Sequence, residues 1–171
     1  VWQRRHFQQG GLEAGLRYWQ DQLADSLRAE IRPDFSRATR RAGSGDRFEF
    51  QIAPSLRRSL ETLGRECEAT LYMTLAAAWF LLLFRYTGED DVCFGTPVAG
   101  RPTPRTRELI GCFVNTVVLR GQRPSHGDAR EWVRRTRETI LEALSAPANG
   151  CAGRAKPYWK RFRTVTCPLS H

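Results

Sequence analysis

Residues 71–86 constrain the fold of this chain more than any other segment, because they are apolar on nearly every side of a helix. Thr74 interrupts the run, which is shorter than the roughly 20 residues that a membrane-spanning helix needs. Thr70 can cap the start of this helix, and Gly88 can end it. We therefore predict a helix that the rest of the chain buries on most of its sides, and no membrane as a partner.

The periodicity of the remaining sequence predicts the elements that pack around this helix. Helices are expected over residues 10–24, 54–67 and 129–145, and strands over residues 47–52, 92–96 and 112–119. The buried stripes of the three helices are expected to be Leu12, Leu16, Trp19 and Leu23; Leu56, Leu60, Leu63 and Cys67; and Trp132, Val133, Thr136, Ile140 and Leu144. Asp128 can cap the last helix, and Pro97 is expected to end a strand. This order predicts an α/β or α+β layered fold.

The net charge of +9 is concentrated near the end of the chain. Residues 151–171 hold five basic residues and no acid, which leaves only +4 for residues 1–150. That remainder is mildly basic and has no nucleic-acid motif, so we expect no nucleic-acid partner. From Asn149 onward the apolar periodicity stops, and both lysines of the chain lie in this stretch. We interpret it as a basic tail that is either disordered or out of frame, and we favour the second interpretation.

The cysteines and histidines do not form a metal site by their spacing. The five cysteines include no CxxC pair, and the three histidines are not near them at ligand spacing. We expect reduced thiols that pack as small apolar groups. Because no secretory signal is visible at the start of the sequence, the expected location is the cytoplasm.

A search for catalytic patterns finds no GxSxG, P-loop or GxGxxG. Asp90 and Asp91 are adjacent carboxylates in a turn, which more often solvate a helix end than share a proton. His126 lies in a turn and His6 has no acidic neighbour, so neither is a strong candidate for acid–base chemistry.

Polar residues inside an apolar strand are more informative. Asn115 and Thr116 interrupt the strand predicted over residues 112–119, and buried polar groups must find partners. Arg101 follows one strand and Arg120 ends the next, so we expect both arginines at one carboxyl edge of the sheet. Such edges are where α/β proteins tend to build sites, and the pattern is typical of a binding channel.

Three stretches resemble condensation domains of nonribosomal peptide synthetases. They are VWQR at residues 1–4 with YWQDQL at residues 18–23; RYTGEDDV at residues 85–92 with GTPVAGR at residues 95–101; and IGCFVNTVVLR at residues 110–120. The last two, in this order and at this spacing, are specific to the family. The resemblance covers residues 1–148.

The resemblance implies a fold like that of chloramphenicol acetyltransferase, with two lobes around a tunnel. This chain would supply part of the C-terminal lobe. The implied reaction is aminolysis of an upstream thioester by a downstream aminoacyl amine, which forms a peptide bond. The substrates would arrive on phosphopantetheine arms, so the implied partners are peptidyl and aminoacyl carrier proteins and adjacent synthetase domains, with no cofactor bound directly.

The chain departs from the family in its motifs. The HHxxxDG motif, whose second histidine deprotonates or positions the amine, is absent, and no two histidines are adjacent. The family motifs expected after the last predicted helix are absent as well. We therefore predict a partial condensation domain over residues 1–148, a tail over residues 149–171 that does not belong to the family, and no catalytic residue.

The resemblance assigns supporting roles to five residues. Arg101 would pair with the aspartate of the absent motif and hold the active-site loop. Asn115 and Thr116 would line or brace the tunnel, Gly111 would allow a close backbone approach, and Arg120 would be structural.

Three functional interpretations remain open. The first is a truncated condensation domain that is inactive alone and exposes apolar surface where another lobe should pack. The second is a fragment of an epimerization or heterocyclization domain, although the Phe-Val-Asn-Thr pattern at residues 113–116 favours condensation. The third is a basic binding module that acts alone, which would be stable by itself and bind an acidic partner.

Overall fold

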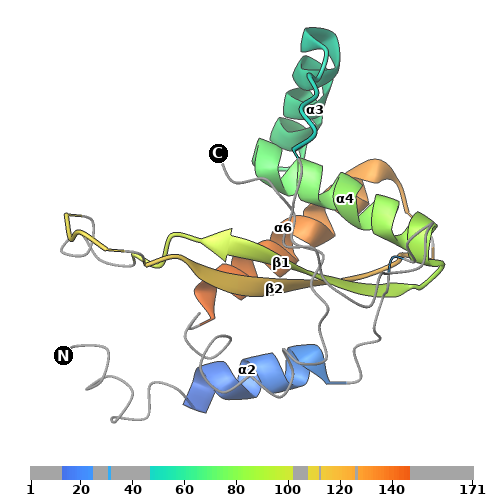
Figure 1. The fold of residues 1–171 in the computed structure, drawn as a ribbon. Coiled ribbons are helices and arrows are strands. Elements are labelled where there is room, and N and C mark those ends of the chain that lie inside the picture. The colour runs from blue at the N-terminus through green and yellow to red at the C-terminus, as the bar shows by residue number, and fades with distance from the viewer. Residues whose placement is uncertain are drawn as a thin grey trace, which may run out of the picture.

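A computed structural model of the chain describes residues 13–24, 31, 47–101, 108–111, 113–125 and 127–146. These residues form four helices and two strands, which are in chain order (Figure 1) α2 (Glu13–Leu23), α3 (Pro54–Glu66), α4 (Leu71–Thr87), β1 (Asp91–Val98), β2 (Asn115–Gln122) and α6 (Ala129–Ser145). The mixture of helices and strands in layers agrees with the predicted fold class.

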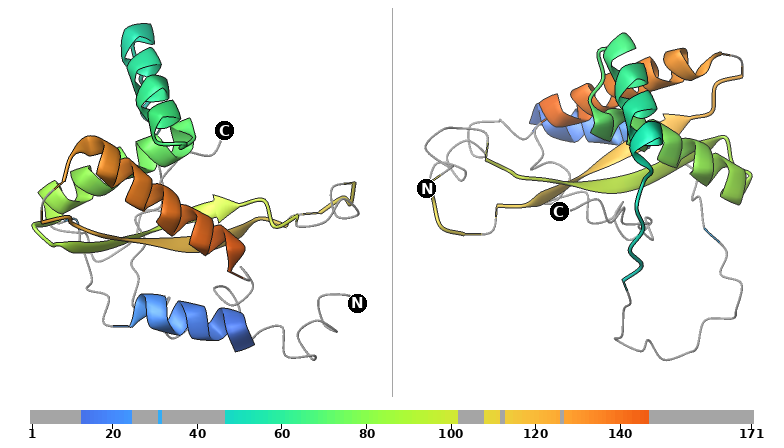
Figure 2. Two further views of the ribbon diagram at one scale, coloured as in Figure 1. Left: turned by 180° about the vertical axis from the view of Figure 1, so that it is seen from behind. Right: turned by 90° about the horizontal axis from the view of Figure 1, so that it is seen from above.

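The two strands form an antiparallel hairpin. Asp91 pairs with Gln122 at one end and Val98 pairs with Asn115 at the other. In Figure 1, α4 lies above the strands and α2 lies below them, while α6 crosses behind. The view from behind in Figure 2 shows α6 crossing in front of the strands, so the hairpin is covered by helices on more than one side.

The core forms around aromatic residues of α4. The ring of Phe80 lies 4.7 Å from the ring of Phe94 on β1 and 5.9 Å from Trp132 on α6, measured between ring centroids. Phe84, one turn later on α4, lies 5.6 Å from the same tryptophan. The Trp132 indole N–H donates to the Ala77 carbonyl at 2.9 Å, which satisfies its polar atom inside the core.

The predicted burial of α4 is confirmed on one side and wrong on the other. Met73, Thr74, Ala76, Ala77, Phe80, Leu83 and Phe84 are buried. Leu81, Leu82 and Tyr86 are exposed, because no described element packs on their side of the helix. The exposed apolar surface that the truncated-domain interpretation predicts is therefore found on this side of α4.

The predicted helix caps are confirmed. The Thr70 hydroxyl accepts a hydrogen bond from the Met73 amide, and Gly88 ends α4 with a left-handed backbone at φ 74°. The Asp128 carboxylate accepts from the Glu131 amide at 2.8 Å at the start of α6. Each cap satisfies polar groups that a helix end leaves without partners inside the helix.

The strand predicted over residues 47–52 does not form. These residues lie before α3 without strand pairing, and Phe48 and Phe50 are 87% and 73% exposed. The stripe predicted for α3 is confirmed toward the end of the helix and wrong at its start. Cys67 is buried, Leu60 and Leu63 are half-buried with Leu63 packed against the core, and Leu56 is exposed. Figure 1 shows the reason, because α3 stands away from the hairpin and only its last turns reach the other helices.

Several element boundaries and burial assignments also differ from the prediction. β1 runs through Pro97 to Val98, because each strand of a two-stranded hairpin is an edge strand that tolerates proline. β2 begins at Asn115, three residues later than predicted. On α6 Ala143 is buried and Leu144 is exposed, whereas the other four residues of its predicted stripe are buried. On α2 Trp19 and Leu23 are buried, and Leu12 lies outside the described residues.

No helix of the described residues has by itself both the length and the apolarity needed to cross a bilayer. Among the described helices, only α3 and α4 taken together reach that length and apolarity, and the chain bends by 102° between them.

Gly121 gives a test of this core. A Cβ atom at Gly121 would lie 2.5 Å from the Phe80 ring, whose side chain is almost fully buried and cannot move aside easily. We expect Gly121→Ala to lower the free energy of unfolding by about 1–3 kcal/mol, the usual cost of overpacking. Urea unfolding followed by tryptophan fluorescence measures it. Gln122→Ala at the exposed neighbouring position is the control, and equal stability of the two variants would contradict this packing.

Candidate functional site

Four of the five predicted site residues gather at one end of the hairpin. Asn115 and Thr116 begin β2 opposite Val98 and Pro97 of β1, and Arg101 follows the end of β1. Gly111 lies in the connection between the strands. Figure 1 shows this end of the hairpin extending beyond the helices.

Arg101 holds the connection against the strand end. Its guanidinium donates to the Leu109 carbonyl at 2.9 Å and to the Gly111 carbonyl at 3.0 Å. The same group lies over the ring of Phe113, with its central carbon 4.4 Å from the ring centroid. A planar guanidinium suits this combination of forked hydrogen bonds and stacking, which an ammonium group could not reproduce. Arg101 therefore holds Leu109, Gly111 and Phe113 in place.

Two glycines permit the close packing of this connection. Gly100 has φ 62°, and a Cβ atom there would lie 1.9 Å from the Phe113 carbonyl oxygen. Gly111 has φ 147°, and a Cβ atom there would lie 3.2 Å from the Phe113 ring. Both backbones are in the positive-φ region that favours glycine. We predicted a close backbone approach at Gly111, but the neighbouring atoms lie closer to Gly100.

Asn115 and Thr116 are half-buried, and their polar groups have local partners. The Thr116 amide donates to Asn115 Oδ1 at 2.8 Å. The hydroxyl of Tyr72 on α4 donates to Thr96 Oγ1 on β1 at 2.7 Å, which places a second polar pair beside the strands. The sequence analysis did not predict this second pair. Tyr72 and Thr96 both lie within apolar stretches, and a polar side chain in such a stretch is a signal that could have identified them.

Arg120 lies at the opposite end of the hairpin, so the prediction that it shares an edge with Arg101 is wrong. The strands run antiparallel, and Arg120 therefore faces Cys93 near the start of β1. Its guanidinium forms a salt bridge with Asp91, with Nε to Oδ1 and Oδ2 distances of 2.9 and 3.0 Å. Both side chains are largely buried.

The same arginine ties the hairpin to α2. Arg120 Nη1 donates to the carbonyls of Gln22 and Ala24, at 2.8 and 2.9 Å. These carbonyls belong to the last residues of α2 and the residue after it, where a helix leaves acceptors without partners. Arg120 therefore joins three segments that are distant in sequence, which agrees with the structural role expected for it.

The adjacent carboxylates of Asp90 and Asp91 have separate partners. Asp91 pairs with Arg120, and Asp90 pairs with Arg123 at 3.0 Å. The prediction that Asp90 and Asp91 solvate a helix end is therefore wrong, because each carboxylate forms an ion pair with an arginine. Drawing the strands as an antiparallel hairpin would have placed Asp91 near Arg120 and revealed one of these ion pairs.

Cys93 lies near these charges, and its environment disfavours the thiolate. Burial, together with the nearby Asp91 carboxylate, raises the pKa of its thiol to about 12, although the Arg120 guanidinium acts against the shift. A thiol with this pKa stays protonated at neutral pH, and only the thiolate attacks efficiently.

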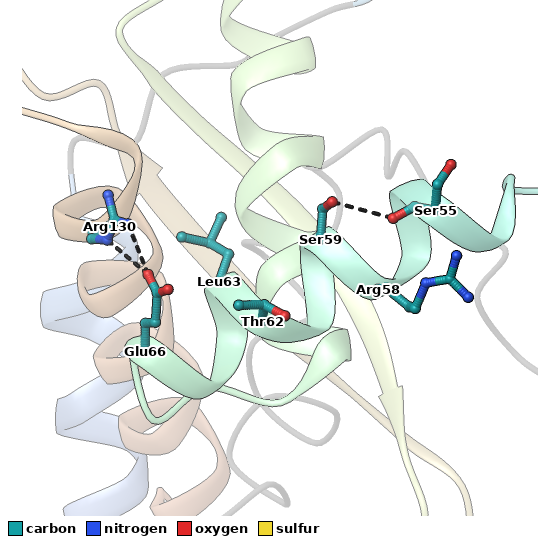
Figure 3. A pocket seen from close by; sticks show the side chains of 7 residues that line it. All are labelled: Ser55, Arg58, Ser59, Thr62, Leu63, Glu66 and Arg130. Carbon is teal, nitrogen blue, oxygen red and sulfur yellow. Dashed lines mark hydrogen bonds and ion pairs between the residues drawn. The ribbon is translucent and has the colours of Figure 1, made fainter.

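Two hollows of about 420 Å³ each lie away from the predicted cluster. Figure 3 shows the first, between α3 and the start of α6, with the 2.9 Å salt bridge from Arg130 to Glu66 at one end and the Ser59 hydroxyl, bonded to the Ser55 carbonyl, farther along α3. Its lining residues are Ser55, Arg58, Ser59, Thr62, Leu63, Glu66 and Arg130. The second lies beside Arg120 and Trp132. Neither includes Arg101, Gly111, Asn115 or Thr116.

Within the part of the chain that the structure describes, no group of three His, Cys, Asp or Glu side chains could hold a metal ion. His6, His126 and His171 lie outside the described residues. The remaining polar side chains of the cluster position the backbone and offer hydrogen bonds, and none is a general base.

Comparison with known proteins identifies the class of this structure. The sequence model of the condensation domain matches residues 1–150, and the chain therefore belongs to the condensation domain family. One of the linear gramicidin synthase proteins of Brevibacillus parabrevis is 41% identical over 146 residues, which are 85% of this chain and 3% of that protein. Cyclosporin synthetase simA from Tolypocladium inflatum is 37% identical over 150 residues, which are 86% of this chain and 1% of that protein.

Solved structures share the fold. The SgcC5 protein from Streptomyces globisporus matches with a TM-score of 0.73 and 26% identity, over 85% of this chain and 33% of that chain. The condensation domain from Monacolin K polyketide synthase MokA matches with a TM-score of 0.69 and 21% identity, over 85% of this chain and 36% of that chain. The chain thus spans about a third of these two chains and a small part of the synthetases.

The buried ion pair gives a second prediction. Arg120→Ala leaves the largely buried Asp91 carboxylate without its main cation and frees the carbonyls of Gln22 and Ala24. We expect a loss of about 3 kcal/mol in the free energy of unfolding, because removing one partner of a buried pair strands the other.

Arg135→Ala is the matched control for this prediction. Its salt bridge with Glu131 is exposed, so we expect a loss of at most about 1 kcal/mol. Urea unfolding of both variants measures the difference. Equal losses would show that the Arg120–Asp91 pair is no more important than a surface pair.

Proposed function

We propose that this chain forms part of the C-terminal lobe of a nonribosomal peptide synthetase condensation domain. The parent domain would join an upstream acyl group and a downstream aminoacyl group, both held as thioesters on carrier proteins. In that reaction the amine nitrogen attacks the thioester carbonyl, an amide bond forms, the carbon–sulfur bond breaks and the amine loses a proton. The match over residues 1–150 carries this proposal, and the similarity to gramicidin and cyclosporin synthetases supports it.

The chain alone is proposed to be inactive in this reaction. It contains no HHxxxDG and no adjacent histidines. Arg101, which orders residues 109–113, is proposed as a positioning residue that also meets the aspartate of that motif in a complete domain. Asn115 and Thr116 would brace the tunnel wall beside it, and Gly111 would keep the backbone compact.

The proposed partners are carrier proteins with phosphopantetheine arms and the neighbouring domains of a synthetase. The four-domain nonribosomal peptide synthetase AB3403, bound to AMP and glycine, shares the fold with a TM-score of 0.70. We propose a cytoplasmic location, no directly bound cofactor, and a boundary near residue 148 after which the tail does not contribute to the domain.

Heterocyclization is the second candidate, because its domains share the fold. The cyclization-docking bidomain of EpoB from Sorangium cellulosum matches with a TM-score of 0.72 at 17% identity. The Phe-Val-Asn-Thr sequence of residues 113–116 favours condensation over this alternative. Amide formation without ring closure would separate the two in a product assay.

A domain exchange tests the proposal. The matched 146-residue segment of the linear gramicidin synthase protein is replaced by the corresponding residues of this chain, and amide formation between loaded carrier proteins is followed by mass spectrometry. We expect the chimera to form the amide and this chain alone to form none. A folded but inactive chimera would overturn the proposed function.

Arg101→Ala in the same chimera tests the positioning role. Loss of the guanidinium releases residues 109–113, and we expect amide formation to slow at least about tenfold, since small misplacements near a reacting centre are costly. Arg134→Ala on the exposed side of α6 is the control and should leave the rate within about twofold. An unchanged rate in Arg101→Ala would remove this residue from the site.

A further inference from the structure

Residues 48–52 show the pattern of a strand without being part of a sheet. Phe48, Phe50 and Ile52 alternate with Glu49 and Gln51, and all five are exposed. The rings of Phe48 and Phe50 stack with centroids 6.3 Å apart, as expected for side chains two positions apart on one face of an extended backbone. The polar face carries Glu49, which pairs with Arg47 at 3.7 Å.

This pattern is costly in water without a partner. Phe48 and Phe50 expose most of their surface and Ile52 exposes 39% of its surface, at a cost of roughly 25 cal/mol for each Å² of apolar area left uncovered. Extended backbone gains its hydrogen bonds only from a neighbouring strand, and isolated strands are not stable in water. The segment therefore has the side-chain pattern of a sheet strand, and among the described residues it pairs with neither β1 nor β2.

A further apolar side chain is exposed shortly after the segment. Leu56, on the first turn of α3, is 53% exposed, whereas Leu60 and Leu63 are half-buried. Figure 1 shows α3 projecting from the rest of the structure, and the view from above in Figure 2 shows residues 47–53 leading away from the start of this helix. Phe48 and Phe50 stack on each other and are both exposed, so they form a patch rather than scattered surface residues, and such patches mark interaction sites.

The occupant of this surface follows from the extent of the chain. About two thirds of the solved chains that share this fold lie outside the matched region. We propose that residues 48–52 add as a strand to an open sheet edge in the part of the condensation domain outside this chain, with Phe48, Phe50 and Ile52 in that part's core. This inference rests on the proposed function, because it requires that the chain be part of a condensation domain.

Hydrogen–deuterium exchange of the chain and of the active chimera tests the strand. In the chain alone, the amides of residues 48–52 should exchange at rates typical of unstructured peptide. In the chimera, alternate amides should exchange at least about tenfold more slowly, because every second N–H of an edge strand points to its neighbour.

A pair of variants separates the apolar face from the polar face. Phe50→Asp places a charge on the face that should enter the core, and we expect it to abolish the slow exchange of residues 48–52 in the chimera. Gln51→Asp introduces the same charge one residue later on the polar face, and exchange should stay within about twofold of the parent chimera.

The outcomes distinguish this inference from the proposed function. A chimera that forms amide while residues 48–52 exchange freely overturns the strand and leaves the function standing. A chimera with slow exchange and no amide formation supports the strand and overturns the function. Slow exchange of residues 48–52 in the chain alone would overturn the inference, whatever the chimera does. If that protection does not depend on protein concentration, the partner strand is this chain's own hairpin. If the protection increases with concentration, the partner is a second copy of the chain.

Discussion

The burial of Phe80 is the constraint on which the described structure depends. Its ring contacts Phe94 and Trp132, so one side chain of α4 joins the hairpin and α6 in a single core. Gly121 on β2 has no side chain at the point where the ring approaches, which lets the second strand lie close as well. Without this contact, each helix and the two-stranded hairpin would be marginal in water, because short helices and isolated hairpins gain most of their stability from packing.

The hairpin separates two groups of polar residues that serve different purposes. At one end, Arg101 orders the connection between the strands and places Asn115 and Thr116 beside it. At the other, Arg120 and Asp91 form a buried ion pair that reaches α2. The first group orders a loop and is the group proposed to support the tunnel wall, and the second joins the hairpin to α2.

Local features of this fold could be predicted from the sequence, and features that depend on a partner could not. Thr70, Gly88 and Asp128 act within one helical turn, so their roles follow from neighbouring residues alone. The strand expected over residues 47–52 failed because a strand needs a neighbour, and nothing in its own sequence supplies one. The grouping of Arg101 with Arg120 failed because periodicity identifies strands without giving their direction, and here the direction is antiparallel. The motif resemblance located the Arg101 cluster, while the Asp91 partner of Arg120 required the strand register.

The contacts of Arg120 also bear on the order in which this structure assembles. Its hydrogen bonds to the carbonyls of Gln22 and Ala24 join residues 98 and 96 positions apart in the sequence. The hairpin and the contact between α4 and α6 close much shorter loops, and the entropy lost on closing a loop grows with its length. Contacts between distant residues slow folding for the same reason. We therefore expect docking of α2 onto Arg120 to follow formation of the hairpin and its aromatic core.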